Sequence, residues 1–151
     1  MRVNLNGNFA VLKGLLPKMI ENKFGRIVAF AGGGAAYQYP LFKAYSASKT
    51  AIVRTVENLH EEFKGYGDFS IVALAPGAVE TDTLRSVRKA GAEVKTVVDI
   101  SEPVTFVREF LESERCNISG SFVHVRDNWR YYLNSNNQLS QDSLWKLRRI
   151  E

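Results

Sequence analysis

The chain is poor in the residues that build disulfide frameworks and metal centres. Its 151 residues include one cysteine, Cys116, and two histidines, His60 and His124. A single cysteine excludes an internal disulfide framework, and none of these three residues has a partner at metal-ligand spacing. We therefore expect an inert thiol, two ordinary histidines and no metal site.

The chain also lacks the long apolar segments that enter membranes. It contains no run of about 18 apolar residues, and its opening residues MRVNLN have neither the charged start nor the apolar centre of a secretory signal. The lysines and arginines behind the net charge of +4 are scattered rather than gathered in one stripe. These absences predict a cytoplasmic protein without a membrane or nucleic-acid partner.

The residues that are present suit one globular domain. With 45% hydrophobic and 24% charged residues, the chain has enough apolar side chains for a sizeable core. Three short runs rich in aliphatic and aromatic residues are bounded by turn-forming residues, and they predict buried strands at 26–31, 70–75 and 121–125.

Helical patterns alternate with these runs. Apolar residues recur at helical spacing before the first run, between the first two, and after Ser101, where Pro103 marks a helix start. The alternation predicts an α/β fold: a partial Rossmann-like, three-layer α/β/α arrangement with a parallel sheet of about three strands. Residues 81–99 are less regular, and we interpret them either as a mobile substrate loop or as an ordinary long connection.

The strongest chemical signal is a tyrosine followed four residues later by a lysine. Tyr45 and Lys49 lie one helical turn apart on one face of the predicted second helix. An ammonium beside a phenol can lower the pKa of the phenol and make it a proton donor or acceptor near neutral pH. Taken alone, the spacing is more typical of a packed aromatic and a solvated lysine.

Two further segments carry candidate binding residues. The segment Pro76-Gly77-Ala78-Val79-Glu80-Thr81 directly follows the second predicted strand, where Gly77 lets the backbone approach a flat ligand and Thr81 offers a hydroxyl. Pro76-Gly77 alone is more typical of a tight turn. Asn4 precedes the first predicted helix, and by itself it also fits a helix N-cap.

The order and spacing of these motifs resemble the C-terminal half of a short-chain dehydrogenase/reductase, from Val3 to about Val125. The resemblance implies that Tyr45 and Lys49 are catalytic, that Lys49 also binds the nicotinamide ribose, and that Asn4 helps to hold a proton-relay water. It further implies nicotinamide contacts from the segment after the second strand, at Pro76, Gly77, Val79 and Thr81.

The resemblance also implies a cofactor and partners. The cofactor is NAD or NADP, and the substrate is a small alcohol or ketone. A homodimer or homotetramer is expected, because helices near 5–23 and 45–64 resemble those that build the family's dimer interface.

Two departures from the family pattern stand out. The family's substrate-orienting serine falls at Gly32, and no hydroxyl lies beside it in the sequence, so Tyr37 or Tyr39 is a hypothetical substitute. The N-terminal βαβαβ half, with its glycine-rich pyrophosphate turn, is missing, and Gly32-Gly33-Gly34 lacks the spacing to replace that turn. The first strand is then left with an open edge that another chain is expected to cap.

Two hypotheses about function remain open. In one, residues 1–125 are the C-terminal half of a Rossmann domain that performs NAD(P)-dependent hydride transfer. In the other, the chain is a non-catalytic, oligomeric remnant that acts as a binding or interaction module. In both, the aromatic and basic extension 126–151, which includes Trp129 and Trp145, packs against the body or a neighbouring subunit.

Overall fold

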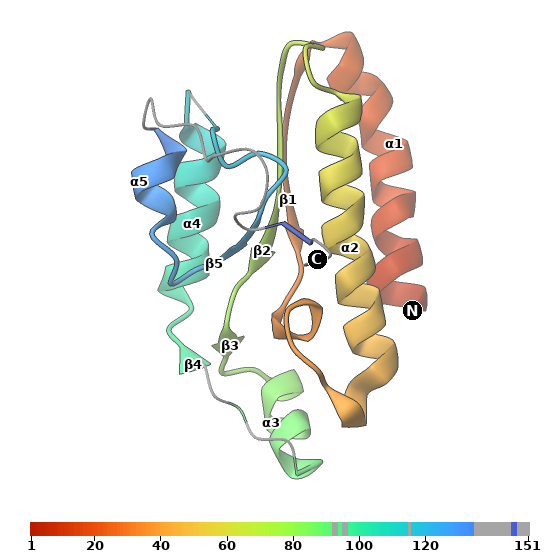
Figure 1. Cartoon of the computed structure of the whole chain (residues 1–151), viewed down its shortest axis with the longest axis vertical. Coiled ribbons are helices and arrows are strands. Elements are labelled where there is room, and N and C mark those ends of the chain that lie inside the picture. The colour runs from red at the N-terminus through yellow and green to blue at the C-terminus, as the bar shows by residue number, and fades with distance from the viewer. Residues whose placement is uncertain (92–93, 95–96, 115, 135–145, 148–151) are drawn as a thin grey trace, which may run out of the picture.

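The computed structural model describes residues 1–91, 94, 97–114, 116–134 and 146–147. At its centre is a parallel sheet of three strands in the order β1-β2-β5, formed by Phe24–Phe30, Asp68–Ala75 and Phe122–His124. Helices α1 (Asn8–Glu21) and α2 (Lys43–Glu62) cover one face, and α4 (Ser101–Glu112) and α5 (Trp129–Leu133) cover the other (Figure 1). The three predicted strands and the three-layer α/β/α class are confirmed.

The central strand β2 shows why this sequence folds into three layers. Its residues alternate between two cores, because successive side chains of a strand point to opposite faces. Val72 and Leu74 join the core under α4 and α5, whereas Ile71 and Ala73 join the core under α2, and none of the four is more than 1% exposed. Each large apolar side chain buried in this way contributes about 1.5–3 kcal/mol of transfer free energy.

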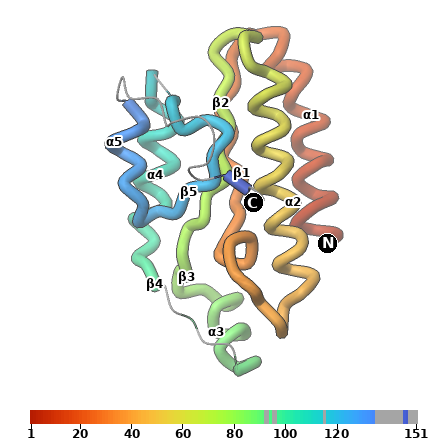
Figure 2. Tube along the Cα trace, viewed as in Figure 1, coloured from red at the N-terminus to blue at the C-terminus, as the bar shows by residue number. Residues whose placement is uncertain are grey.

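The first strand lies at an edge of the sheet. β1 pairs along its whole length with β2, and no other strand pairs with it within the described residues. Helix α1 contacts β1, α2 packs mainly on β2, and the chain trace places α1 at the outer side of the molecule (Figure 2). None of the residues of α1 is buried, so this helix has little of the sheet beneath it.

The region predicted to be irregular, 81–99, contains a helix. Helix α3 spans Asp82–Lys89, and Thr81 caps its N-terminus by accepting a hydrogen bond from the Leu84 amide. Short strands β3 (Ala78–Val79) and β4 (Val97–Val98) pair in parallel beside it. The expectation of an irregular segment is therefore wrong for α3, a short and mostly polar helix in which Leu84 is the buried residue.

Among its described residues, the C-terminal region contacts the body through α5 and through Leu147, among other contacts. In α5, the Trp129 ring packs edge-on against Phe106, with ring centroids 4.8 Å apart, and its Nε1 donates to the Val125 carbonyl at 3.0 Å. Leu147 lies on α2, where its amide donates to Glu57 at 2.7 Å and its carbonyl accepts from Arg54 at 2.9 Å. Trp145 falls outside the described residues.

Among the helices that the structure describes, none is both long and apolar enough to cross a bilayer. Within the same residues, no group of three or more His, Cys, Asp or Glu side chains is placed to hold a metal ion.

Candidate active site

The site is built where β1 ends. After Phe30 the chain passes through Ala31 and Gly32 into two short 3₁₀ turns, Gly33–Ala35 (η2) and Pro40–Phe42 (η3), and then enters α2. The hydroxyl of Ser46 donates to the Gly34 carbonyl and fixes the first turn of α2 against this loop. The start of α2 therefore lies at the carboxyl end of a parallel strand, which is where ligands bind in open α/β sheets.

Tyr45 and Lys49 come together at this end of the sheet. Lys49 Nζ lies 5.7 Å from the centroid of the Tyr45 ring. The same ammonium donates a hydrogen bond of 2.8 Å to the Phe30 carbonyl at the end of β1. The structure thus pairs the two residues as the sequence predicts and adds a backbone anchor for the lysine.

Gly32 lies directly against the hydroxyl of Tyr45. A Cβ atom built on Gly32 would lie 2.9 Å from Tyr45 Oη, and the glycine has φ +156°, which other residues rarely adopt. The ring of Tyr45 is partly open to solvent, with 41% of the residue exposed, but its hydroxyl occupies the space in which a side chain at position 32 would begin.

Burial acts on the protonation of both residues. The pKa of the Tyr45 phenol is raised, first by burial and then by the nearby charge of Tyr39. The pKa of the Lys49 ammonium is lowered by burial. The expectation that Lys49 lowers the pKa of Tyr45 is therefore wrong for this structure, because the cost of desolvating the phenolate dominates.

Asn4 lies inside a helical turn and is tied to α2. It belongs to the π-helical turn Arg2–Gly7, whose preceding cap is Met1, so Asn4 is not an N-cap. Its Nδ2 donates to Ser48 Oγ at 3.4 Å, and Ser48 Oγ donates to the Tyr45 carbonyl at 2.6 Å. The structure therefore connects Asn4 to the turn that carries Tyr45, while its role with a relay water stays a prediction.

The segment after β2 is shaped by contacts that the sequence does not reveal. Gly77 has φ +73°, and a Cβ atom there would lie 2.7 Å from Val98 Cγ1. Val79 pairs with Val98 across β3 and β4. Sequence reasoning missed Val98, because its contact with Gly77 is long-range and leaves no local pattern.

The two hypothetical substitutes for the missing serine differ in position. Tyr37 is 76% exposed. Tyr39 lies closer, because its Oη is 3.6 Å from the position of a Cβ atom on Gly33, beside Gly32. Tyr39 thus lies against the glycine loop that also contacts Tyr45. The side chain of Tyr37 is mostly exposed to solvent.

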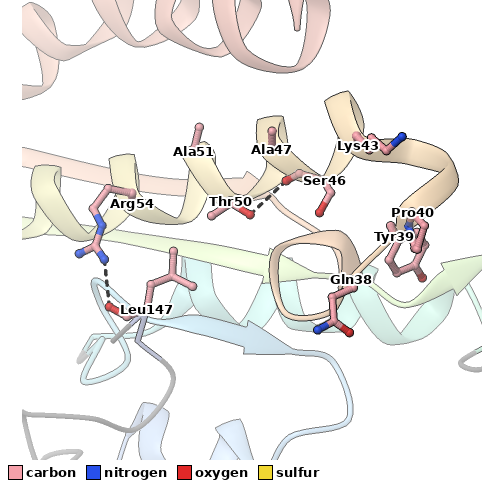
Figure 3. Close-up of a pocket in the computed structure, with 10 residues that line it drawn as sticks. All are labelled: Gln38, Tyr39, Pro40, Lys43, Ser46, Ala47, Thr50, Ala51, Arg54 and Leu147. Carbon is pink, nitrogen blue, oxygen red and sulfur yellow. Dashed lines mark hydrogen bonds between the residues drawn. The ribbon is translucent and has the colours of Figure 1, made fainter. Parts of the chain in front are cut away.

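An open groove of about 970 Å³ runs along the outer face of α2 (Figure 3). Its lining residues are Gln38, Tyr39, Pro40, Lys43, Ser46, Ala47, Thr50, Ala51, Arg54 and Leu147. Neither Tyr45 nor Lys49 lines it, and the small side chains Ala47 and Ala51 are part of its lining. Sequence reasoning missed this groove and the position of Leu147 at one end of it.

The residues predicted to contact a nicotinamide dinucleotide lie at the ends of two adjacent strands. The Lys49 ammonium and the Tyr45 and Thr81 hydroxyls come from segments that follow the adjacent strands β1 and β2. The glycines at 32–34 lead into a 3₁₀ turn rather than an α-helix, and the α-helix that follows begins at Lys43 without a side-chain cap. Within the described residues, the glycine run does not present the N-terminus of an α-helix, so it does not fit a pyrophosphate.

The fold and the placement of the site define a Rossmann-type α/β protein with its polar residues at the strand ends. The profile of the short chain dehydrogenase family matches residues 1–92. The chain therefore belongs to the short-chain dehydrogenase family, whose cofactor is NAD or NADP.

Individual proteins are similar to this chain in sequence or in fold. A short chain dehydrogenase of Pseudocercospora fijiensis is 36% identical over 80 residues, which are 53% of this chain and 26% of that protein. Levodione reductase superimposes with a TM-score of 0.71 at 24% identity, covering 80% of this chain and 52% of that one. A 3-oxoacyl-[acyl-carrier protein] reductase of Brucella melitensis, solved with bound NAD, superimposes with a TM-score of 0.68 at 25% identity. This match covers 82% of this chain and 47% of that one. The chain thus spans about half or less of the length of these relatives.

Proposed function

We propose that this chain is the C-terminal half of an NAD(P)-dependent oxidoreductase that interconverts an alcohol and a ketone. The observation that carries the proposal is the pairing of Tyr45 and Lys49 at the end of β1, beside the segment that follows β2. In this proposal, residues 1–125 form the half-domain, and residues 126–151 form an extension that packs on the body or on a neighbouring subunit.

Each predicted site residue has one role. The bound cofactor supplies or accepts the hydride. Tyr45 donates a proton from Oη to the substrate oxygen during reduction and takes it back during oxidation, while the Lys49 ammonium holds the ribose and the Asn4 turn anchors the relay water. The nicotinamide contacts come from the segment after β2, at Pro76, Gly77, Val79 and Thr81.

Gly32 limits this chemistry. A hydroxyl at that position would help to orient the substrate carbonyl, and losing one positioned donor to a developing oxyanion typically costs a factor of about 10²–10³ in rate. We therefore expect slow turnover from this chain even when cofactor is bound.

A second candidate function is a non-catalytic binding or interaction module. It is favoured by the way in which the two key side chains are already engaged inside the chain. Tyr45 Oη lies against Gly32, and Lys49 Nζ donates to Phe30, so both polar groups have neighbours without any ligand. The raised pKa of Tyr45 also works against proton transfer near neutral pH.

Calorimetric titration of the 151-residue protein with NADH and with NADPH separates the two functions. The oxidoreductase proposal predicts binding in the micromolar range that Lys49→Ala abolishes, because the ammonium that holds the ribose is gone. Lys43→Ala is the matched control, since Lys43 lies on the same helix but lines the outer groove instead. Absence of binding at millimolar cofactor, or equal binding by Lys49→Ala, contradicts the oxidoreductase and favours the module.

A further inference from the structure

His124 ends the strand β5 at the edge of the sheet where the candidate active site lies. In the register of the sheet, Phe30 of β1 pairs with Leu74 of β2, and the next residue of β2, Ala75, pairs with His124. All three strands are parallel, so their carboxyl ends meet at this edge, where ligands bind in open α/β sheets. His124 therefore lies level with the chain directly after Phe30, with β2 between them.

The His124 side chain lies on the face of the sheet that α2 covers. Successive residues of a strand point to opposite faces. Val123 belongs to the core under α4 and α5, whereas Phe122 packs against the core under α2. His124 follows Val123 and so returns to the α2 face. The imidazole and the pair formed by Tyr45 and Lys49 thus share one end and one face of the sheet.

Hydrogen bonds fix the imidazole in a tight turn. The His124 amide donates to Asp127 Oδ2 at 2.7 Å, and the Asp127 amide donates to the His124 carbonyl at 2.9 Å. The Arg126 amide donates to Nδ1 of the His124 ring at 3.1 Å. A ring nitrogen that accepts a hydrogen bond carries no proton, so the neutral imidazole holds its proton on Nε2. His124 therefore presents a hydrogen-bond donor of fixed orientation.

This Nε2 donor has no partner among the described residues. The His124 ring is half-buried, and its hydrogen bond is the one to Arg126. Within the described part of the chain, Arg26 Nε is the one side-chain nitrogen or oxygen that is both buried and unpartnered, so His124 Nε2 reaches solvent. A donor that is already fixed and open to solvent loses little conformational freedom when it binds a ligand.

We propose that His124 Nε2 binds a second oxygen of the substrate, so that the preferred substrate is a carbonyl compound with another hydrogen-bond acceptor a few bonds from the reacting carbonyl. The inference rests on the proposed hydride transfer, in which Tyr45 Oη serves the reacting oxygen. Two strand spacings, about 10 Å, separate the ends of β1 and β5. The Tyr45 hydroxyl lies against Gly32 at one side of this span, and the imidazole extends into it from the other.

The surroundings of the ring suit an uncharged acceptor. The turn carries one carboxylate, Asp127, and one guanidinium, Arg126, whose Nη2 donates to the Val97 carbonyl at 2.6 Å. The turn therefore has no surplus of positive charge to select an anion. A neutral imidazole donor beside it matches a carbonyl, ether or hydroxyl oxygen.

Nitrogen NMR of the histidine rings tests the donor before any ligand is added. In the ¹⁵N-labelled full chain at mildly alkaline pH, the His124 ring should carry its proton on Nε2. The His124→Gln variant assigns the signal by removing it, and the His60 ring serves as the internal control. A His124 proton on Nδ1 overturns the proposal.

Two ketones then isolate the second oxygen. Methyl acetoacetate carries a second carbonyl, and butyl methyl ketone has the same main-chain length without it. Each is added with the oxidised cofactor that binds, NAD⁺ or NADP⁺, so that no hydride is transferred. We expect the His124 Nε2 signal to shift with methyl acetoacetate and not with butyl methyl ketone. Equal shifts from both ketones, or no shift from either, overturn the proposal.

Turnover gives a readout that a merely structural role of His124 would not move. With reduced cofactor, the ratio of kcat/KM for methyl acetoacetate to that for butyl methyl ketone should fall about three- to tenfold in His124→Phe, the effect of one neutral hydrogen bond. The His124→Gln variant keeps an N–H donor near the position of Nε2 and should restore most of the ratio. An unchanged ratio in His124→Phe overturns the proposal, because general damage to the fold lowers both rates together.

Cofactor titration separates this inference from the proposed function. If NADH or NADPH binds and the two ketones nevertheless act alike on the His124 signal, the oxidoreductase stands and His124 does not select its substrate. If neither cofactor binds, the oxidoreductase falls and the role of His124 falls with it.

Discussion

At the scale of single residues, Gly32 decides how the Tyr45 hydroxyl is placed. Its φ is +156°, and a Cβ atom added to it would lie 2.9 Å from Tyr45 Oη, so the loop has adapted to glycine and has not merely lost a serine. Restoring the family's hydroxyl at this position therefore conflicts with the backbone and with the tyrosine together.

We predict that Gly32→Ser destabilises the protein and does not raise its activity. Strain at such a backbone position costs about 1–3 kcal/mol, and the collision with Tyr45 Oη adds to it. Urea unfolding followed by circular dichroism measures the loss. Gly33→Ser is the matched control, because a Cβ atom there meets only Tyr39 Oη at 3.6 Å, an ordinary contact. A Gly32→Ser variant as stable as wild type and faster in turnover contradicts this interpretation of the loop.

At the scale of elements, His60 links α2 to the central strand β2 through Ser119, in the turn that precedes β5. Its Nδ1 lies 2.9 Å from Ser119 Oγ, which also accepts the Ile71 amide at 3.1 Å. Burial, reinforced by the charge of Lys146, lowers the pKa of His60 in the folded chain. The folded chain therefore favours the neutral imidazole at this link.

This link predicts that the protein loses stability when it is acidified. The unfolded histidine titrates near pH 6.5, above the lowered pKa of the folded state, so the unfolded chain binds the extra proton first. The His60 contribution is fully present above about pH 6.5 and is lost as the pH falls from there through the folded pKa. Urea midpoints between about pH 7.5 and pH 5 should fall more for wild type than for His60→Gln. Parallel pH dependence in the two proteins excludes His60 as the cause.

The same scale shows how far local sequence predicts structure. The strands were predictable because β1, β2 and β5 are short apolar runs between turn residues, and α2 was predictable because its apolar residues recur at helical spacing. Helix α3 was not, because it buries only Leu84 and depends on its Thr81 cap. In the site, the juxtaposition of Tyr45 and Lys49 follows from a local spacing, whereas the contacts of Gly32 with Tyr45 and of Gly77 with Val98 depend on the tertiary path of the loops.

At the scale of the whole molecule, the outer face of α2 remains available for association. The groove beside it is lined in part by alanines, and small side chains let a neighbouring helix approach closely. This face belongs to one of the two helices for which the family resemblance predicts a dimer interface.

We predict a homodimer, measured as twice the chain mass by light scattering at micromolar concentration. Ala47→Glu places a charge in the groove lining and should shift the protein toward the monomer, because a buried unpaired carboxylate is costly. Val104→Glu is the control, since Val104 is 58% exposed on α4, in the opposite layer. A monomeric wild-type chain, or equal effects of the two substitutions, contradicts an interface on α2.

The strand order β1-β2-β5 has a consequence for the time course of folding. β2 is the middle strand and pairs with two strands that are distant in the sequence. One partner, β1, precedes α2, and the other, β5, follows α4. Contacts between such distant segments form slowly, because a long loop must close before any pairing is gained. During synthesis, the apolar side chains of β2 that pack under α4 and α5 therefore stay exposed until the later helices and β5 have been made. This interval is when a chaperone is most needed.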